Sequence, residues 1–208
     1  MSHSEITFFA NPQSRSRIVR WMLEELNVPY KTEVLEYGEA MKSEAYLAIN
    51  PMGKVPAILH NGQVITECAA ICAYLADAFS DRNLAPPLDD RGAYYRWMFF
   101  SAGPLEAAIT NKALGFEVPL ERQRMAGYGH YDLAVETLAM AVSRTPYIAG
   151  DLFSAADVYV GSHVIWGIDY KTLPERKEFV EYAEKLRNRP ACLRANELDD
   201  ALTRKSSS

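Results

Sequence analysis

The sequence predicts two domains of different class, a small α/β domain with a mixed sheet and an all-α helical domain. Three observations predict this division. Strand-like and helix-like segments alternate over the first 80 residues, strand patterns are not found further on, and a polar stretch with two prolines separates the parts. The predicted domains are residues 1–80 and 92–208, with residues 81–91 as the linker.

The first half of the α/β domain reads as strand, helix, strand. Residues 5–10 (EITFFA) are rich in strand-forming residues, and the turn signal Asn11-Pro12 ends them. Apolar residues then recur at helical spacing up to Pro29, and residues 30–37 are again strand-like. The other side of the predicted helix carries the charged residues Arg17, Arg20, Glu24 and Glu25.

The second half contains a hairpin. Residues 43–50 fit a short helix, and two strands follow within residues 55–66. Between these strands lies Asn61-Gly62, a strong signal for a two-residue hairpin turn. A helix over residues 67–79 completes the order βαβαββα, which joins a parallel crossover and a hairpin in one mixed sheet.

The remainder of the chain has helical periodicity throughout. The predicted helices are residues 93–114, 121–144, 155–168, 176–188 and 191–202. No apolar run approaches the roughly 18 residues that span a bilayer. A net charge of −5 argues against a general nucleic-acid binder. The three cysteines include no CxxC pair, so we expect a cytoplasmic protein without disulfides.

Three local motifs combine with this layout. A serine-containing turn follows the first strand, GKVP stands at residues 53–56, and TECAAI opens the third helix at residue 66. Together they resemble the cytosolic glutathione S-transferases, and among these the bacterial, serine-type members. The resemblance covers nearly the whole chain. It implies a thioredoxin-like first domain that binds glutathione as co-substrate, an all-helical second domain, and a homodimer.

The resemblance assigns the glutathione contacts. The family's proline at Pro56 is cis, and the backbone of Val55 then pairs with the cysteinyl unit of glutathione as an added strand. Without the resemblance, a trans proline opening an edge strand would be preferred. Glu67 would contact the γ-glutamyl ammonium group, and Cys68, where the family usually has serine or threonine, its carboxylate. Lys42 and Lys54 are candidates for the glycyl carboxylate, or solvated surface lysines.

The loop after the first strand is expected to carry the chemistry. A free thiol is mostly protonated at neutral pH, and a hydrogen-bond donor aimed at its sulfur favours the thiolate. The candidates are Ser14, which we favour, and as alternates Asn11, Gln13 and Ser16. Ser14 also fits an N-cap, and several classes of the family align their functional residue on Gln13. Arg15 and Arg17 either add positive potential or form an ordinary helix face.

In the second domain, Tyr94, Trp97 and Trp166 are plausible walls of a pocket for an apolar electrophile, although such aromatic stripes more often form core. Ser154 and Asp157 predict a structural N-capping box. The four histidines are scattered, so we expect no metal.

The predicted function is therefore a detoxifying transferase in which glutathione thiolate attacks a small apolar electrophile. A glutathione-dependent peroxidase or reductase, and a non-catalytic glutathione-binding or protein-interaction module, are the alternatives. No nucleic acid or membrane partner is expected.

Overall fold

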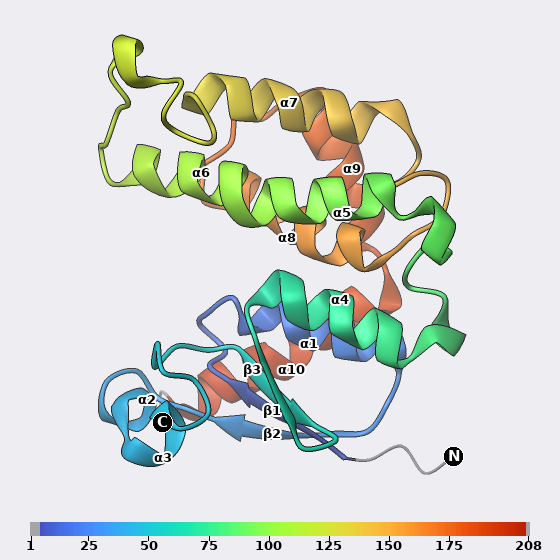
Figure 1. Ribbon diagram of the computed structural model, residues 1–208. Coiled ribbons are helices and arrows are strands. Elements are labelled where there is room, and N and C mark those ends of the chain that lie inside the picture. The colour runs from blue at the N-terminus through green and yellow to red at the C-terminus, as the bar shows by residue number, and fades with distance from the viewer. Residues whose placement is uncertain (1–4, 207–208) are drawn as a thin grey trace. The chain divides into compact units, whose positions relative to one another are not determined.

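A computed structural model describes residues 5–206 of the chain, which form two compact units. Within the described residues, the first unit contains residues 5–82 and 188–206, and the second contains residues 83–187. The first unit is the thioredoxin-like α/β domain together with one further helix, and the second is entirely helical apart from an isolated bridge (Figure 1).

The sheet of the first unit has the predicted mixed topology. Its strands are β1 (Ile6–Ala10), β2 (Tyr30–Val34), β3 (Ala57–His60) and β4 (Gln63–Thr66), in the order β2-β1-β3-β4. β1 runs parallel to β2 and antiparallel to β3, and β3 runs antiparallel to β4. Asn61 and Gly62 both have positive φ, 53° and 73°, as the hairpin turn requires.

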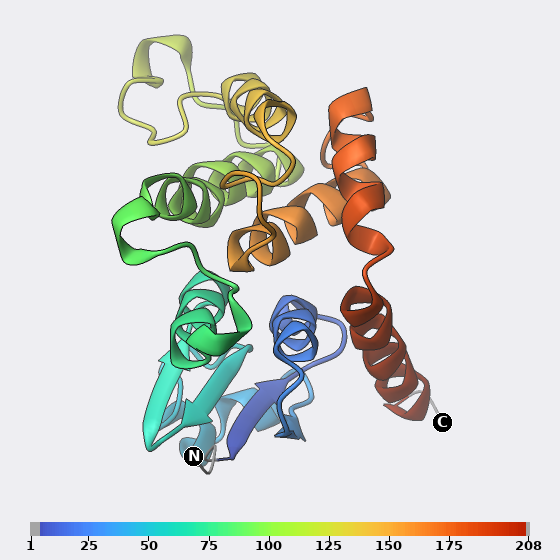
Figure 2. The ribbon, with the colours of Figure 1, turned by 90° about the vertical axis from the view of Figure 1, so that its right-hand side faces the viewer.

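Two long helices cover one face of this sheet. α1 (Ser16–Leu26) and α4 (Cys68–Ala78) lie side by side above it (Figure 2). Their inward faces and the strands form the core, in which Phe8, Met22 and Leu75 are fully buried. Two short helices, α2 (Glu39–Lys42) and α3 (Glu44–Leu47), connect β2 to β3, and η1 (Ser80–Arg82) follows α4. The sequence predicted α3 but not α2.

The last helix, α10 (Pro190–Ser206), belongs to the first unit, whereas the sequence placed it in the helical domain. It packs along α1, and small buried residues on its inner face let the two helices approach: Ala191, Cys192 and Ala195. The face of α1 that α10 covers carries the charged residues that the sequence placed opposite the apolar stripe. The division differs from the predicted one because these charges have partners on α10.

The second unit is built from helices and short helical turns. α5 (Gly92–Phe100), a π-helical turn η3 (Ser101–Leu105) and α6 (Glu106–Ala113) form one continuous rod (Figure 1). Pro104 lies in the π-helical turn, where its missing N–H leaves the regular hydrogen-bond pattern interrupted. The other elements are η2 (Leu88–Asp90), η4 (Leu120–Arg122), α7 (Tyr131–Arg144), α8 (Ala155–Asp169) and α9 (Lys177–Arg187).

α8 forms the centre of this unit, since it is buried along nearly its whole length. Its apolar residues pack against α5 and α9, and a capping box fixes its start. In the described part of the chain, 5–206, no helix combines the length and apolar character needed to cross a bilayer.

The predicted helix over residues 121–144 is wrong for its first ten residues. α7 begins only at Tyr131, after His130 in extended conformation and Gly129 with φ of +67°. The helical periodicity of the preceding residues is interrupted by two glycines, which favour turn conformations over a continuous helix.

Candidate functional site

The loop before β3 contains the proline that the sequence singled out. The Val55-Pro56 peptide bond is cis, as the family resemblance implied. Val55 lies two residues before Ala57, the first paired residue of β3. The preceding carbonyl, that of Lys54, accepts hydrogen bonds from Tyr46 Oη and Asn50 Nδ2, both at 2.7 Å. The backbone that leads into Val55 is therefore held by two side chains.

The start of α4 lies against the loop that precedes α1. Cys68 is the first residue of α4 and is 9% exposed, and its Sγ lies 3.6 Å from the carbonyl oxygen of Arg15. Glu67 precedes it as the N-cap, with an exposed side chain and φ of +66°. Non-glycine residues rarely adopt a positive φ, and such positions concentrate at functional sites.

The strained backbone of Glu67 gives a direct test. Both Glu67→Gly and Glu67→Ala remove the carboxylate, but only glycine adopts this φ without strain. We expect the glycine variant to be more stable than the alanine variant by about 1 kcal/mol in urea unfolding. Equal stabilities would show that the surrounding structure relaxes to relieve the strain.

The side chains of Asn11 and Ser16 are occupied within the loop after β1. Asn11 is 3% exposed; its Nδ2 donates to the Leu35 carbonyl at 2.9 Å and its Oδ1 accepts from Gln13 N at 2.9 Å. Ser16 is fully buried, and its Oγ accepts from Asn11 N at 3.2 Å. Both residues support the loop from within, and Gln13 is exposed.

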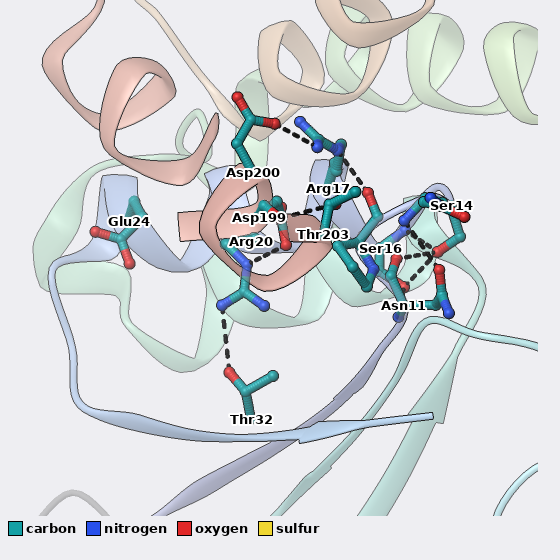
Figure 3. A network of polar contacts seen from close by, with 12 residues as sticks. Asn11, Ser14, Ser16, Arg17, Arg20, Glu24, Thr32, Asp199, Asp200 and Thr203 are labelled. Atoms are coloured by element: carbon teal, nitrogen blue, oxygen red, sulfur yellow. Dashed lines mark hydrogen bonds and ion pairs between the residues drawn. The ribbon is translucent and has the colours of Figure 1, made fainter. Parts of the chain in front are cut away.

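Ser14 is half-buried and lies at the centre of a short hydrogen-bond chain (Figure 3). Its Oγ is 2.7 Å from the Asn11 carbonyl oxygen, 2.8 Å from Ser16 Oγ and 3.0 Å from Ser16 N. A hydroxyl has one proton to donate. When Ser14 donates it to the Asn11 carbonyl, its Oγ accepts from both the hydroxyl and the amide of Ser16. The sequence also allowed Ser14 as an N-cap, but the N-cap of α1 is Arg15, and Ser14 Oγ accepts from the backbone N–H of Ser16 at the helix start.

The two candidate lysines differ in their surroundings. Lys42 donates from Nζ to the carbonyls of Met52 and Gly53, at 3.0 and 3.2 Å, and so braces the turn before the cis proline. The Lys54 side chain is exposed. Lys42 thus supports the loop with its side chain. Lys54 takes part in the loop through its backbone carbonyl, and its ammonium group faces solvent.

The aromatic residues predicted for an electrophile pocket are mostly core residues of the second unit. Tyr94 is 1% and Trp97 5% exposed, and Trp166 is half-buried. A cavity of about 320 Å³ in this unit lies elsewhere, between the end of α6 and the start of α7, with Lys112 and Tyr131 in its lining. None of the three predicted residues lines it.

Ser154 and Asp157 form a capping box at the start of α8. Asp157 accepts from Ser154 N at 2.9 Å, and it also accepts from Ile148 N and Tyr182 Oη, both at 2.8 Å. Burial raises the pKa of the Asp157 carboxyl, and these hydrogen bonds offset part of that effect. The arrangement ties α8 to α9 and to the loop before α8, which is a structural role.

Two supports of the Ser14 loop escaped the sequence analysis. Tyr37 Oη donates to the Gln13 carbonyl at 3.0 Å, and Arg17 Nε donates to the Pro12 carbonyl at 2.6 Å. Tyr37 follows β2 and carries no motif. Arg17 stood out in the sequence only as one of several charges on a helix. Pro12 stands five residues before Arg17 in the sequence, and this short separation is the one signal that favoured the contact.

Comparison with known proteins shows which family the chain resembles. Residues 14–78 match the family described as Glutathione S-transferase, N-terminal domain. Over 90% of the chain and 85% of its own length, Glutathione S-transferase 3 of Schizosaccharomyces pombe is 28% identical. Glutathione S-transferase 1 of the same yeast is 35% identical over 69% of the chain and 66% of its own length.

Solved structures add the same fold over the full length. The glutathione S-transferase of a sphingomonad, solved in complex with glutathione, has a TM-score of 0.76 and 25% identity, and the match covers 93% of this chain and 98% of that one. The cis-proline loop, the start of α4 and the serine-containing loop thus occur in a chain that is similar to these enzymes from end to end. The chain belongs to the glutathione S-transferase family.

Proposed function

We propose that this chain is a glutathione transferase that binds glutathione on its first unit and holds the thiol as thiolate through Ser14. The observation that carries the proposal is the meeting of the α4 start with the Ser14 loop, where Cys68 Sγ lies 3.6 Å from the Arg15 carbonyl. The sphingomonad relative, a glutathione S-transferase complexed with glutathione, supports the choice of ligand.

In the proposed complex, the tripeptide adds to the edge at Val55, which lies outside the ladder of β3. Glu67 takes the ammonium of the γ-glutamyl unit. The N-terminal amides of α4, beginning at Cys68, take its carboxylate, because a helix N-terminus favours an anion. Lys54 and Lys42 are left for the glycyl carboxylate, with Lys42 giving up one carbonyl contact to reach it.

Ser14 acts by turning its proton from the Asn11 carbonyl to the glutathione sulfur. The two donors from Ser16 remain on Ser14 Oγ during this rotation, and they make the Ser14 hydroxyl a stronger donor. A donor aimed at the sulfur lowers the thiol pKa, so the thiol proton is released to solvent at neutral pH. The thiolate then forms the S–C bond with an apolar electrophile, whose leaving group departs with the electron pair.

We expect Ser14→Ala to lower kcat/KM with chlorodinitrobenzene about 10²-fold, because one preorganised donor to the reacting sulfur is lost. The ultraviolet absorbance of bound glutathione thiolate should disappear at pH 7, while S-methylglutathione, which has no thiol, should bind as before. Gln13→Ala is the matched control in the same loop and should leave the thiolate signal intact. A thiolate signal that Gln13→Ala removes instead would move the donor role to that residue.

The same protein samples distinguish the transferase from the alternative functions. Turnover of a hydroperoxide in place of the aryl halide would indicate a glutathione-dependent peroxidase. Glutathione binding without any thiolate signal in the parent protein would indicate a binding module without turnover. Light scattering on the purified protein tests the proposed homodimer. The proposed role in the cell is detoxification in the cytoplasm. Tyr94, Trp97 and Trp166 stay in the proposal as residues for an electrophile pocket of the second unit, and two of them are buried.

A further inference from the structure

Helix α10 reaches the Ser14 loop through one arginine. Arg17 Nε donates to the Pro12 carbonyl at 2.6 Å, and its Nη2 forms an ion pair with Asp200 Oδ1, also at 2.6 Å. The guanidinium group therefore bridges the loop that carries Ser14 and a side chain of α10. Figure 3 shows Arg17 between Asp200 and the cluster of Asn11, Ser14 and Ser16.

The bridge is the last in a row of ion pairs along two antiparallel helices. From one end to the other, the pairs are Arg189–Glu25, Arg194–Glu24, Asp199–Arg20 and Asp200–Arg17. As the residue numbers rise from Arg189, just before α10, to Asp200, they fall on α1, so the row ends at the first turn of α1. Of these pairs, Arg17–Asp200 contains the arginine that also contacts the loop backbone.

The neighbouring pair fixes α10 in place. Arg20 and Asp199 are 3% and 1% exposed, and Arg20 also donates to Tyr30 Oη and Thr32 Oγ1 of β2. Since Asp200 adjoins this anchored residue, its carboxylate is held where Arg17 meets it. The Arg17–Asp200 pair itself is more open, with exposed fractions of 25% and 52%. A pair this accessible contributes little to stability, so its geometry can be tested without loss of the fold.

We infer that Arg17 is a positioning residue, through which Asp200 of α10 holds the Pro12 carbonyl and thereby the Ser14 hydroxyl in the orientation that meets the glutathione sulfur. The inference rests on the proposed function and adds α10 to the site. The order of the contacts is Asp200, Arg17, the Pro12 carbonyl, and then Ser14 two residues further on. A small displacement of a reacting group lowers a rate strongly, which makes such a link measurable.

Asp200→Ala is the decisive variant because charge and positioning predict opposite signs. The loss of a negative charge near the site, acting alone, favours the thiolate and lowers the pKa of bound glutathione. The loss of the link instead misplaces the Ser14 donor and raises that pKa. We expect the pKa to rise, and kcat/KM with chlorodinitrobenzene to fall about tenfold. The Kd of S-methylglutathione should stay unchanged, since that ligand presents no thiol.

Four further variants complete the test. Glu197→Ala removes the same charge from an exposed position on α10 and should resemble the parent protein. Asp200→Asn keeps an acceptor oxygen for Arg17. It should therefore retain most of the kcat/KM that Asp200→Ala loses, and a thiol pKa close to that of the parent protein. Arg17→Met should raise the pKa at least as far as Asp200→Ala, because the loss of its positive charge acts in the same direction as the loss of the link. The double variant should be no worse than Arg17→Met alone, because both changes break the same link.

The outcomes separate this inference from the proposed function. A pKa in Asp200→Ala that is unchanged or lowered, as charge alone predicts, overturns the positioning role even if Ser14→Ala abolishes the thiolate. Independent, additive effects of Arg17→Met and Asp200→Ala also overturn it. If Ser14→Ala retains the thiolate while Asp200→Ala raises the pKa, the assignment of Ser14 fails and the link acts on another donor of the loop.

Discussion

Replacing Asp157 with alanine is expected to lower the free energy of unfolding by about 4 kcal/mol. The carboxylate is fully buried and accepts four hydrogen bonds, from Ile148 N, Tyr182 Oη, Ser154 N and Ser154 Oγ. Alanine leaves these donors without an acceptor in the interior of the second unit. Each buried donor without a partner costs about 1–3 kcal/mol, and the cap of α8 is lost as well.

The pH dependence of this group has a definite sign. Because burial outweighs the hydrogen bonds, the pKa of Asp157 in the folded protein is raised above its ordinary 3.8. Between these two values the folded protein keeps a proton that the unfolded chain has released. The contribution of this proton to stability is therefore full below pH 3.8 and is lost as pH rises through the folded-state pKa. An Asp157→Asn variant should lack this decline.

Urea unfolding followed by circular dichroism, at several pH values, measures both effects. Asp151→Ala is the matched control, since it removes an exposed aspartate from the same loop and should change stability by less than about 0.5 kcal/mol. An Asp157→Ala protein as stable as this control would show that α8 keeps its position without the capping box.

The second large effect is expected at Arg20. Arg20→Met should destabilise the first unit by about 3–5 kcal/mol, because it leaves the carboxylate of Asp199 buried beside an apolar group. The present partners of the guanidinium are Asp199 Oδ1 at 2.7 Å and the hydroxyls of Tyr30 and Thr32 at 3.2 Å. Burial already raises the pKa of Asp199, with Arg20 acting against it.

A double-mutant cycle tests whether the loss of stability comes from the unpaired buried charge of Asp199. Arg20→Met combined with Asp199→Leu removes both charges and should recover most of the lost stability. The matched control is the Lys31–Glu33 pair of β2, which has a similar distance of 2.6 Å but exposed fractions of 61% and 43%. Glu33→Gln should cost less than about 1 kcal/mol. A double variant as unstable as Arg20→Met alone would contradict a pairwise origin of the effect.

Local sequence signals predicted the elements on which the site is built. Asn61-Gly62 identified the hairpin because both positions need positive φ, and the GKVP motif located the cis bond at Pro56 through the family resemblance. Ser154 and Asp157 marked the start of α8 because a capping box depends on residues three apart. These features are determined within a few residues, so one sequence is enough to see them.

The features that the sequence did not reveal depend on distant contacts. Arg17, Arg20 and the two glutamates beside them follow the polar pattern of a solvated helix face, and only the docking of α10 shows that this face is covered. The complementary acids stand about 180 residues away. Within the loop, Asn11 and Ser16 are buried whereas Ser14 is half-buried, and no local sequence pattern predicts this difference in burial.

The packing of α10 on α1 has a consequence for biosynthesis. A ribosome makes α1 early and makes α10 only after the whole of residues 83–187, so the first unit is completed by a segment that arrives after the second unit. Until then the nascent chain leaves Arg20 without its carboxylate, and the charged face of α1 that α10 covers is in contact with solvent. A fragment that stops at residue 82 would stay in that incomplete state, which makes the first unit dependent on translation of the entire described chain.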